Sequence, residues 1–207
     1  MKLRLDHLAV SASSLAEGVA WAEAALGVTF ATGGEHPQMG THNRLLGLGD
    51  LYLEVIAINP AAPAPPHPRW FDLDHFTGPP RLTNWIVACD NLDTALAEGP
   101  EGCGRALPLA RGDFRWRMAV PDSGRLPFDG YFPALIEWQG PAHPALRLPD
   151  SGLRLTRLDL THPQAADLAG SLAGKMIDPR VEMSTGPQKA LRATFSTPSD
   201  KERVISG

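Results

Sequence analysis

The sequence predicts an α+β protein in which tandem strand–helix–three-strand (βαβββ) modules form a curved mixed sheet with a cleft. Residues 5–15 (LDHLAVSASSL) align without a gap with residues 82–92 (LTNWIVACDNL), so the chain contains an internal repeat. Each copy is an apolar strand followed by small and polar residues that can cap a helix, and each is completed by further strands. A weaker third copy begins at Leu155 and predicts a truncated third module.

The first module is predicted at residues 1–65. Ser14 and Glu17 form a capping-box pattern, and the apolar stripe that follows predicts a helix over 14–26. Strand-like runs joined by Gly and Asp turns come next, and the last of them, residues 51–58, is strongly apolar.

The second module is predicted at residues 81–140, with a shorter helix over 92–98 and a last strand over 134–138. The connector at 59–80 contains seven prolines, which is typical of a stiff, extended segment. Its aromatic residues indicate that it packs on the body of the protein. The two modules and this connector are predicted to form one domain over residues 1–140.

The third module is predicted as a partial βαββ unit at residues 150–207. Pro163 is placed at a first helical position, and the helix is expected to end at Gly174. A strand over 191–195 completes the unit. Arg157 and Thr194 occupy the positions that correspond to His7 and Glu54, the candidate site residues of the first module described below. This unit therefore contributes no equivalent site.

Composition excludes several classes of function. The 207 residues have a net charge of -4 and no block of like charge, so nucleic acid is not expected as a partner. No apolar run approaches the roughly eighteen residues that span a bilayer, and Lys2 and Arg4 interrupt any signal-peptide core, so we expect no membrane association and a cytoplasmic location. Cys89 and Cys103 lack metal-site spacing and are expected to be buried.

Strand periodicity singles out two side chains. Alternation places Asp6 with Leu8 on the face that a helix covers, and it places His7 on the opposite face. In the strand over 51–58, Tyr52 and Glu54 share a face, and a carboxylate in so apolar a run is costly to bury without a partner or a cation. His7 and Glu54 are therefore candidate site residues.

The repeat suggests how a metal site could form. Asn84 falls where His7 falls, and Glu137 falls where Glu54 falls, so two related modules would bring these four positions together. His7, Glu54 and Glu137 offer the nitrogen and carboxylate ligands that suit Zn, Mn, Fe or Ni, with Asn84 as a neutral oxygen donor or an outer group. Glu54 or Glu137 would also be the carboxylate that moves a proton.

A set of candidate substrate-binding residues lies beside these positions. Arg44 and Arg117 occupy matching places in the two modules, and paired guanidinium groups near a cleft favour an anionic ligand. The alternative is that they solvate the outside of the sheet. The remaining candidates are two neighbours of Arg44 and two aromatic residues suited to stacking a ring: His42, Asn43, Trp116 and Tyr52. The other histidines are expected to be exposed in loops: His36, His67, His75, His143 and His162.

These features resemble the vicinal oxygen chelate superfamily of glyoxalases, ring-cleaving dioxygenases, epimerases and antibiotic-resistance proteins. The segments LDHLAV, GTHNRLLGLGDLYLEVIA and RWRMAVPDSGRLPFDGYFPALIEWQG carry the resemblance over about residues 3–140, and the chain is most similar to glyoxalase-like domain proteins. The resemblance implies a cleft between the modules, a divalent metal and pairing as a homodimer. Metal-dependent members normally have His or Glu where this chain has Asn84.

Two classes of function fit these observations. The first is a metal-dependent lyase, isomerase or dioxygenase acting on a small anionic or carbonyl-bearing molecule, for which the His7, Glu54 and Glu137 set argues. The second is a protein without metal that binds or sequesters a small molecule in the same cleft, for which Asn84 argues. A metal ligand must be a neutral imidazole, so the first class predicts that metal affinity falls as His7 is protonated.

Overall fold

The structure, a computed structural model, describes residues 2–207 and contains two β-sheets. The first has strand order β2–β3–β4–β1–β5–β8–β7–β6 and the second has order β10–β9–β11–β12. The strands of the first sheet are β1 (Leu3–Ser11), β2 (Ala31–His36), β3 (Thr41–Gly47), β4 (Tyr52–Ile58), β5 (Arg81–Cys89), β6 (Arg105–Arg111), β7 (Phe114–Val120) and β8 (Ala134–Trp138). Those of the second sheet are β9 (Arg154–His162), β10 (Val181–Thr185), β11 (Ala190–Ser196) and β12 (Glu202–Ser206).

The helices are short. The α-helices are α1 (Leu15–Leu26), α2 (Leu92–Glu98) and α3 (Ala165–Leu172), and single 3-10 turns occur at Trp70–His75, Phe128–Gly130 and Pro144–Leu146. Among the described residues, no helix is long and apolar enough to cross a membrane.

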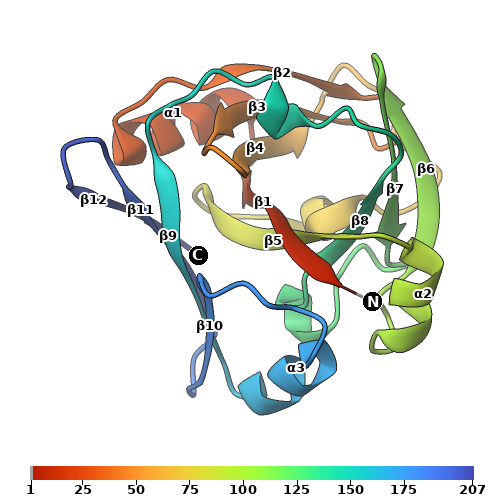
Figure 1. The fold of residues 1–207 in the computed structure, drawn as a ribbon. Coiled ribbons are helices and arrows are strands. Elements are labelled where there is room, and N and C mark those ends of the chain that lie inside the picture. The colour runs from red at the N-terminus through yellow and green to blue at the C-terminus, as the bar shows by residue number, and fades with distance from the viewer. Residues whose placement is uncertain (1) are drawn as a thin grey trace.

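The first sheet is built from two copies of one module, as predicted. In each copy the first and last strands pair in parallel, β1 with β4 and β5 with β8. The copies meet through the antiparallel pair β1–β5 at the centre of the sheet. Figure 1 shows the resulting curved sheet, which confirms the predicted α+β fold class.

Local signals explain the first helix. The Ser14 side chain accepts a hydrogen bond from the Glu17 amide at 3.3 Å, and Gly27 ends the helix in the left-handed region at φ 72°. Gly18 permits a close approach of the helix to the sheet, because a Cβ there would lie 2.6 Å from both Ala12 and Val55. The helix over 14–26 is therefore observed as predicted, with Ser14 as its cap.

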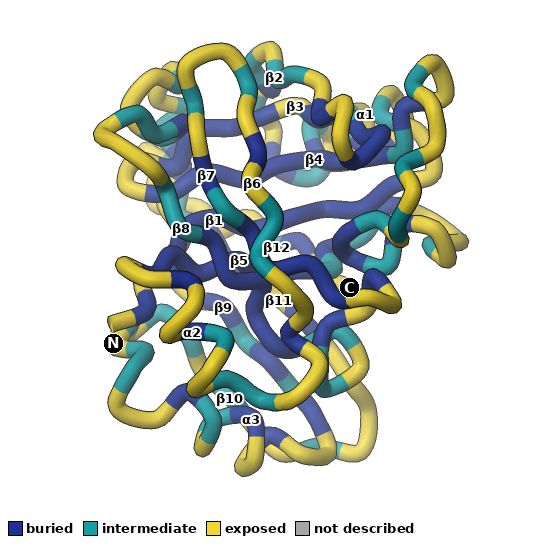
Figure 2. Tube along the Cα trace, turned by 90° about the vertical axis from the view of Figure 1, so that its right-hand side faces the viewer, coloured by how far each residue is buried: buried dark blue, intermediate teal, exposed yellow. Residues whose placement is uncertain are grey.

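The two faces of the first sheet bury separate apolar clusters. One face packs on α1, α2 and the second sheet, and its cluster includes Leu8, Val55, Leu158 and Phe195. The other face holds a smaller cluster that lines the concave side, with Trp70 of the proline-rich connector packed into it. Figure 2 shows buried segments along the central strands β1 and β5. The connector therefore packs on the body and closes the concave face.

The third unit has the expected order of elements but a different topology. Its first strand, β9, pairs in parallel with β10 directly after α3, and β11 and β12 follow as antiparallel neighbours. In the first two modules the first strand instead pairs in parallel with the last one. The unit has four strands, one more than predicted, and forms its own sheet.

A β-bulge in β1 determines which side chains reach the concave face. Leu5 and His7 lie opposite the adjacent residues Val87 and Ile86, so Asp6 is an extra residue in the ladder. Bulges re-aim side chains in this way, and here both Asp6 and His7 face the same site. The prediction that Asp6 lies on the helix-covered face is wrong, because strict alternation does not hold across a bulge.

Candidate functional site

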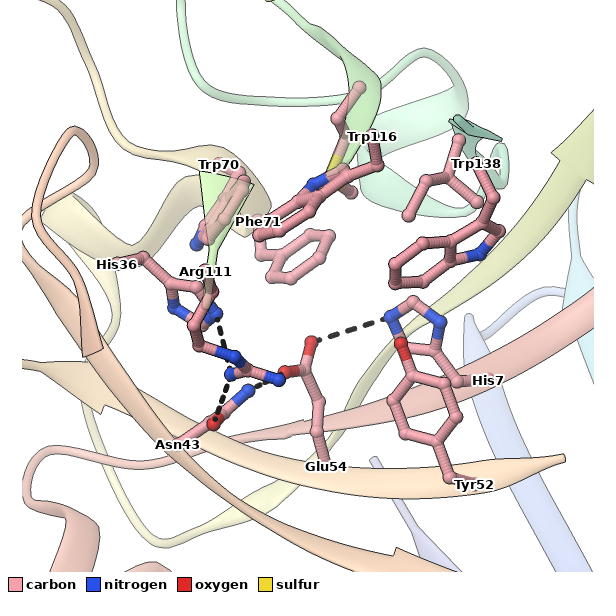
Figure 3. A pocket seen from close by; sticks show the side chains of 12 residues that line it. His7, His36, Asn43, Tyr52, Glu54, Trp70, Phe71, Arg111, Trp116 and Trp138 are labelled. Atoms are coloured by element: carbon pink, nitrogen blue, oxygen red, sulfur yellow. Dashed lines mark hydrogen bonds and ion pairs between the residues drawn. The ribbon is translucent and has the colours of Figure 1, made fainter. Parts of the chain in front are cut away.

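A small cavity lies inside the curved sheet between the two modules. Its volume is about 30 Å³, which is enough for one or two water molecules and too small for an organic substrate without side-chain movement. Figure 3 shows Trp116 and Trp138 on one side of the cavity and Glu54 and His7 on the other. The lining residues are His7, His36, Asn43, Tyr52, Glu54, Trp70, Phe71, Arg111, Trp116, Met118, Ile136 and Trp138.

His7 and Asp6 form a buried ion pair. The His7 Nδ1 atom lies 2.5 Å from Asp6 Oδ1, and both side chains are almost completely buried. Burial alone would lower the pKa of His7, but the hydrogen bond to Asp6 and the negative charges of Asp6 and Glu54 outweigh it and raise the pKa to about 9. Burial would likewise raise the pKa of Asp6, but hydrogen bonds from His143 and His7 hold it well below its usual range. His7 is therefore a cation at neutral pH.

Glu54 faces the free edge of this imidazolium. The His7 Nε2 atom lies 3.6 Å from Glu54 Oε1, too far for a hydrogen bond, while Glu54 Oε2 accepts a bond of 2.8 Å from Asn43 Nδ2. Burial would raise the pKa of Glu54, but the proximity of His7 outweighs it and lowers the pKa. A proton donor and a carboxylate thus face each other across a gap that opens into the cavity.

Neighbouring side chains hold the pair in position. The second oxygen of Asp6 accepts hydrogen bonds from Trp138 Nε1 at 2.9 Å and His143 Nε2 at 3.0 Å. Tyr52 stacks on the His7 ring with 4.3 Å between centroids, and burial, followed by the Asp6 and Glu54 charges, raises the Tyr52 pKa well above its ordinary value. The imidazolium ring therefore has Asp6 at Nδ1, Tyr52 on its face and Glu54 opposite Nε2.

The far side of the cavity presents donors for an anion. Arg111 Nη1 lies 3.2 Å from His36 Nε2 and donates to Asn43 Oδ1 at 3.1 Å. Burial lowers the pKa of His36 to about 4, so this ring is neutral at pH 7. Trp70 Nε1 is buried and has no hydrogen-bond partner among residues 2–207. These donors suit a carboxylate or a carbonyl oxygen.

Glu137 does not join His7 and Glu54. Its Oε2 atom accepts a hydrogen bond of 2.7 Å from the amide of Leu92, the first residue of α2, and lies 3.5 Å from Arg117 Nη2. It faces the side of the sheet that α2 covers, whereas the next residue, Trp138, faces the cavity. Its geometry is that of a helix N-terminal cap.

The strand register explains why the aligned repeat misplaced Glu137. Ala9 and Ile86 are equivalent in the aligned repeat. Ala9 pairs with Glu54, whereas Ile86 pairs with Ala134. The structural counterpart of Glu54 is therefore Ala134, three residues before Glu137. Similarity between the short segments YLEVIA and ALIEW hid this shift.

The structure separates the other predicted residues into two groups. Asn43, Tyr52 and Trp116 line the cavity with His7 and Glu54. The rest lie elsewhere: Arg44 is exposed on β3, His42 is half-buried on the outer face, Arg117 pairs with Asp93, and Asn84 lines a separate pocket. Arg44 and Arg117 point away from the cavity because they alternate with Asn43 and Trp116, which face it.

Four further ionisable residues at or beside the cavity were not predicted as site residues. His36 and His143 were expected to be exposed loop residues, Asp6 was placed on the wrong face, and Arg111 was not considered. Arg111 and His36 are 75 positions apart, and His143 and Asp6 are 137 apart, so no local pattern links them. The segment ATGGEH that ends at His36 shows no alternation of apolar and polar residues, so it carries no local signal of a buried strand residue.

The side chains present do not fit a metal centre. A catalytic site for a first-row metal has about three protein ligands, and among residues 2–207 no group of three His, Cys, Asp or Glu side chains is arranged to hold an ion. His7 and Glu54 both come from the first module. The second contributes apolar side chains to the cavity wall, such as Met118 and Ile136.

The fold and this cavity define an α+β protein of two βαβββ modules with a site between them. The glyoxalase-like domain family matches residues 5–176, so the chain belongs to that family, in agreement with the predicted vicinal oxygen chelate resemblance. A sequence search of curated proteins finds no match.

Comparison with solved structures finds matches at low sequence identity. A hypothetical protein from Staphylococcus aureus is 10% identical, with a TM-score of 0.57 over 99% of this chain and 85% of that one. Methylmalonyl-CoA epimerase from Mycobacterium tuberculosis is 14% identical, with a TM-score of 0.43 over 67% of this chain and 88% of that one. At these identities the first match supports the fold alone.

Proposed function

We propose that this protein is an enzyme that moves a proton on a small anionic, carbonyl-bearing molecule bound between the two modules. The observation that carries the proposal is the 3.6 Å gap between His7 Nε2 and Glu54 Oε1, in which a buried acid faces a buried carboxylate. A base beside the C–H bond and a hydrogen-bond donor at the carbonyl oxygen are one arrangement by which enzymes abstract a proton next to a carbonyl. The reaction class is that of an isomerase or a lyase.

The proposed step uses only this chain's own side chains. Glu54 accepts a proton from the carbon beside the carbonyl, the electron pair of the broken C–H bond forms a C=C bond, and the π pair of the carbonyl moves to its oxygen. The His7 Nε2–H group donates a hydrogen bond to that oxygen and stabilises its developing charge. Delivery of a proton from water to the opposite face of that carbon gives the isomer, and release of the abstracted proton to water restores the Glu54 carboxylate. Arg111 and Trp70 would bind the substrate's carboxylate.

We include no metal in this step, because the donor set described above does not fit one. Protein purified without an affinity tag and treated with a chelator should therefore keep its activity. Stoichiometric Zn, Mn, Fe or Ni, together with loss of activity on chelation, would contradict this part of the proposal.

Solvent exchange tests the chemistry. In D₂O, the wild-type protein should accelerate loss of the C3 proton signal of 2-oxobutyrate, followed by proton NMR. Glu54→Gln should slow exchange by about 100-fold or more, because the amide cannot accept the proton. The control is Glu35→Gln, an exposed carboxylate on β2 that lines neither the cavity nor a neighbouring pocket, and it should exchange at the wild-type rate.

A binding protein is the second candidate, favoured by one observation. The cavity wall from β7 and β8 consists of aromatic and aliphatic side chains, Trp116, Met118, Ile136 and Trp138, and supplies no titratable group. A protein that only sequesters its ligand would bind 2-oxo acids and leave their C3 protons in place. Binding without exchange would therefore favour this candidate over the enzyme.

A further inference from the structure

A second, larger cavity adjoins the candidate site. It is a groove of about 370 Å³ between β2, β3, the β6–β7 hairpin and the segment after Pro144. This volume is at the lower end of the range for small-molecule sites. The apolar residues that line it are Ala31, Leu45, Phe114, Pro144, Leu148 and Pro149.

The groove and the small cavity are continuous through two elements. Arg111 lines both of them. Leu45, in the groove, lies directly opposite Glu54, in the small cavity, in the β3–β4 ladder. Directly opposite residues of an antiparallel pair are on the same face of the sheet, with Cβ atoms about 5 Å apart. A molecule extending past Glu54 along this face therefore enters the groove.

The charged residues that line the groove are both cations. Arg111 and Arg147 are its charged lining residues, and no carboxylate lines it. Arg147 is already paired with Asp113 at 2.7 Å and lies over the Phe114 ring at 4.8 Å. Arg111 forms no ion pair with a carboxylate among residues 2–207; its Nη1 atom bonds to His36 and Asn43, and its guanidinium lies 5.8 Å from the Phe114 ring centroid. Arg111 is thus the cation available to an anionic ligand.

Two glycines of β2 leave room for this arrangement. Gly33 lines the groove without a side chain. A Cβ at Gly34 would lie 2.8 Å from Arg111 Cδ, so the Arg111 stem lies directly against the backbone there. The guanidinium is consequently held at the boundary between the polar cavity and the apolar groove.

We propose that the groove holds the apolar tail of the same molecule whose anionic head reaches Arg111. The ligand class is an organic anion with a hydrocarbon tail of several carbons. The inference rests on the proposed function only for the location of the head group. A cavity of about 30 Å³ cannot hold such a molecule alone, whereas the cavity and groove together can.

Unreactive n-alkanoates test the proposal by binding, without any chemistry. Butanoate, hexanoate and octanoate are titrated into the full chain at pH 7 by calorimetry. Each methylene buried in an apolar groove should strengthen binding by about fourfold, so octanoate should bind roughly two orders of magnitude more tightly than butanoate. Equal affinity for the three acids would overturn the proposal.

Two leucines of one segment provide matched variants. Leu148→Gln changes a half-buried groove residue and should reduce the gain per methylene to twofold or less. Leu146→Gln changes a side chain that is 78% exposed and does not line the groove, and it should keep the wild-type gain. Loss of the chain-length dependence in both variants alike, or in neither, would overturn the proposal.

Arg111→Gln tests the head group. It should weaken all three acids by a similar factor, about tenfold or more, and leave the gain per methylene unchanged. Unaltered affinities in this variant would overturn the placement of the head group. If Leu148→Gln fails to fold, the wild-type series decides the result. Glu54→Gln separates this inference from the proposed function, because it should slow exchange of 2-oxobutyrate by about 100-fold or more while the alkanoate series keeps its slope.

Discussion

His7 is a buried cation held between two carboxylates, and this charge determines what the site can do. A neutral imidazole would be a ligand or a base, whereas the protonated ring of His7 is an acid and a hydrogen-bond donor. Asp6 is responsible for the difference, because its carboxylate accepts from Nδ1 at 2.5 Å and is itself fixed by Trp138 and His143. The bulge in β1 is what brings Asp6 to this face.

Two of the buried histidines, His7 and His36, predict a stability maximum near pH 6.5. The pKa of His7 is raised from 6.5 to about 9, so its contribution to stability is fully present below pH 6.5 and is lost as pH rises through 9. The pKa of His36 is lowered to about 4, so its contribution is present above pH 6.5 and is lost as pH falls towards 4. Urea unfolding at pH values from 4 to 9.5 measures this profile.

Asp6→Asn is the variant that tests the cause. It removes the charge that raises the pKa of His7, so the fall in stability between pH 6.5 and 9 should become shallower while the acid limb is retained. NMR titration of the His7 ring protons should show the same loss directly. A wild-type protein whose stability is constant from pH 6.5 to 9 would contradict the assignment of His7 as a buried cation.

Single-residue patterns could identify part of this site and no more. His7 and Glu54 were predictable because each interrupts an apolar strand, and a buried ionisable group in such a strand needs a partner. Asp6 was not predictable by alternation, because the bulge depends on pairing with β5. Arg111 and His143 reach the site through long-range packing that no local pattern records.

At the scale of elements, one carboxylate illustrates how a strand and a helix are joined. Glu137, on β8, accepts from the amide of Leu92 at the start of α2, alongside the Asn91 side chain, which accepts from Thr94. The first amides of a helix have no partner within the helix, and a carboxylate there also interacts favourably with the helix dipole. Glu137 therefore anchors α2 to the sheet.

Glu137→Gln should accordingly affect stability and leave the site intact. The amide side chain retains an oxygen that can accept, but it loses the charge, so we expect a loss of about 0.5–1 kcal/mol in the free energy of unfolding, and about 1 kcal/mol or more for Glu137→Ala. Denaturant unfolding measures both. Alkanoate affinity should be unchanged, and a loss of that affinity at wild-type stability would contradict the structural role.

The elements themselves were largely predictable, whereas their registers were not. Ser14, Asn91 and Gly27 are local signals, and α1 and α2 begin or end at them. The pairing of Ile86 with Ala134 is a non-local property that sequence similarity between two short strands cannot determine. Misplacing this register by three residues produced the expected metal site of His7, Glu54 and Glu137.

At the scale of the whole molecule, the third unit shares its core with the first two modules. Leu158, Phe195 and Ile205 from the second sheet belong to the same buried cluster as Leu8 and Val55 from the first. The third unit and the pair of modules therefore cover each other's apolar faces, although the pair forms one sheet and the third unit forms another. A shared core of this kind couples their unfolding, because neither face can be exposed without loss of the other's burial.

Ile205→Val tests this coupling with a probe that lies outside the altered unit. The five tryptophans, at positions 21, 70, 85, 116 and 138, all lie in the first two modules and their connector, so their fluorescence reports that part of the protein, while far-UV circular dichroism reports the whole chain. Removing one buried methylene from β12 should lower the free energy of unfolding by about 0.5–1.5 kcal/mol. Because the core is shared, the fluorescence and dichroism midpoints should shift by the same amount in a single transition.

Glu202→Gln, an exposed change in the same strand, should leave both midpoints in place. An unshifted fluorescence midpoint, with a separate dichroism transition at lower denaturant, would show instead that the third unit unfolds on its own.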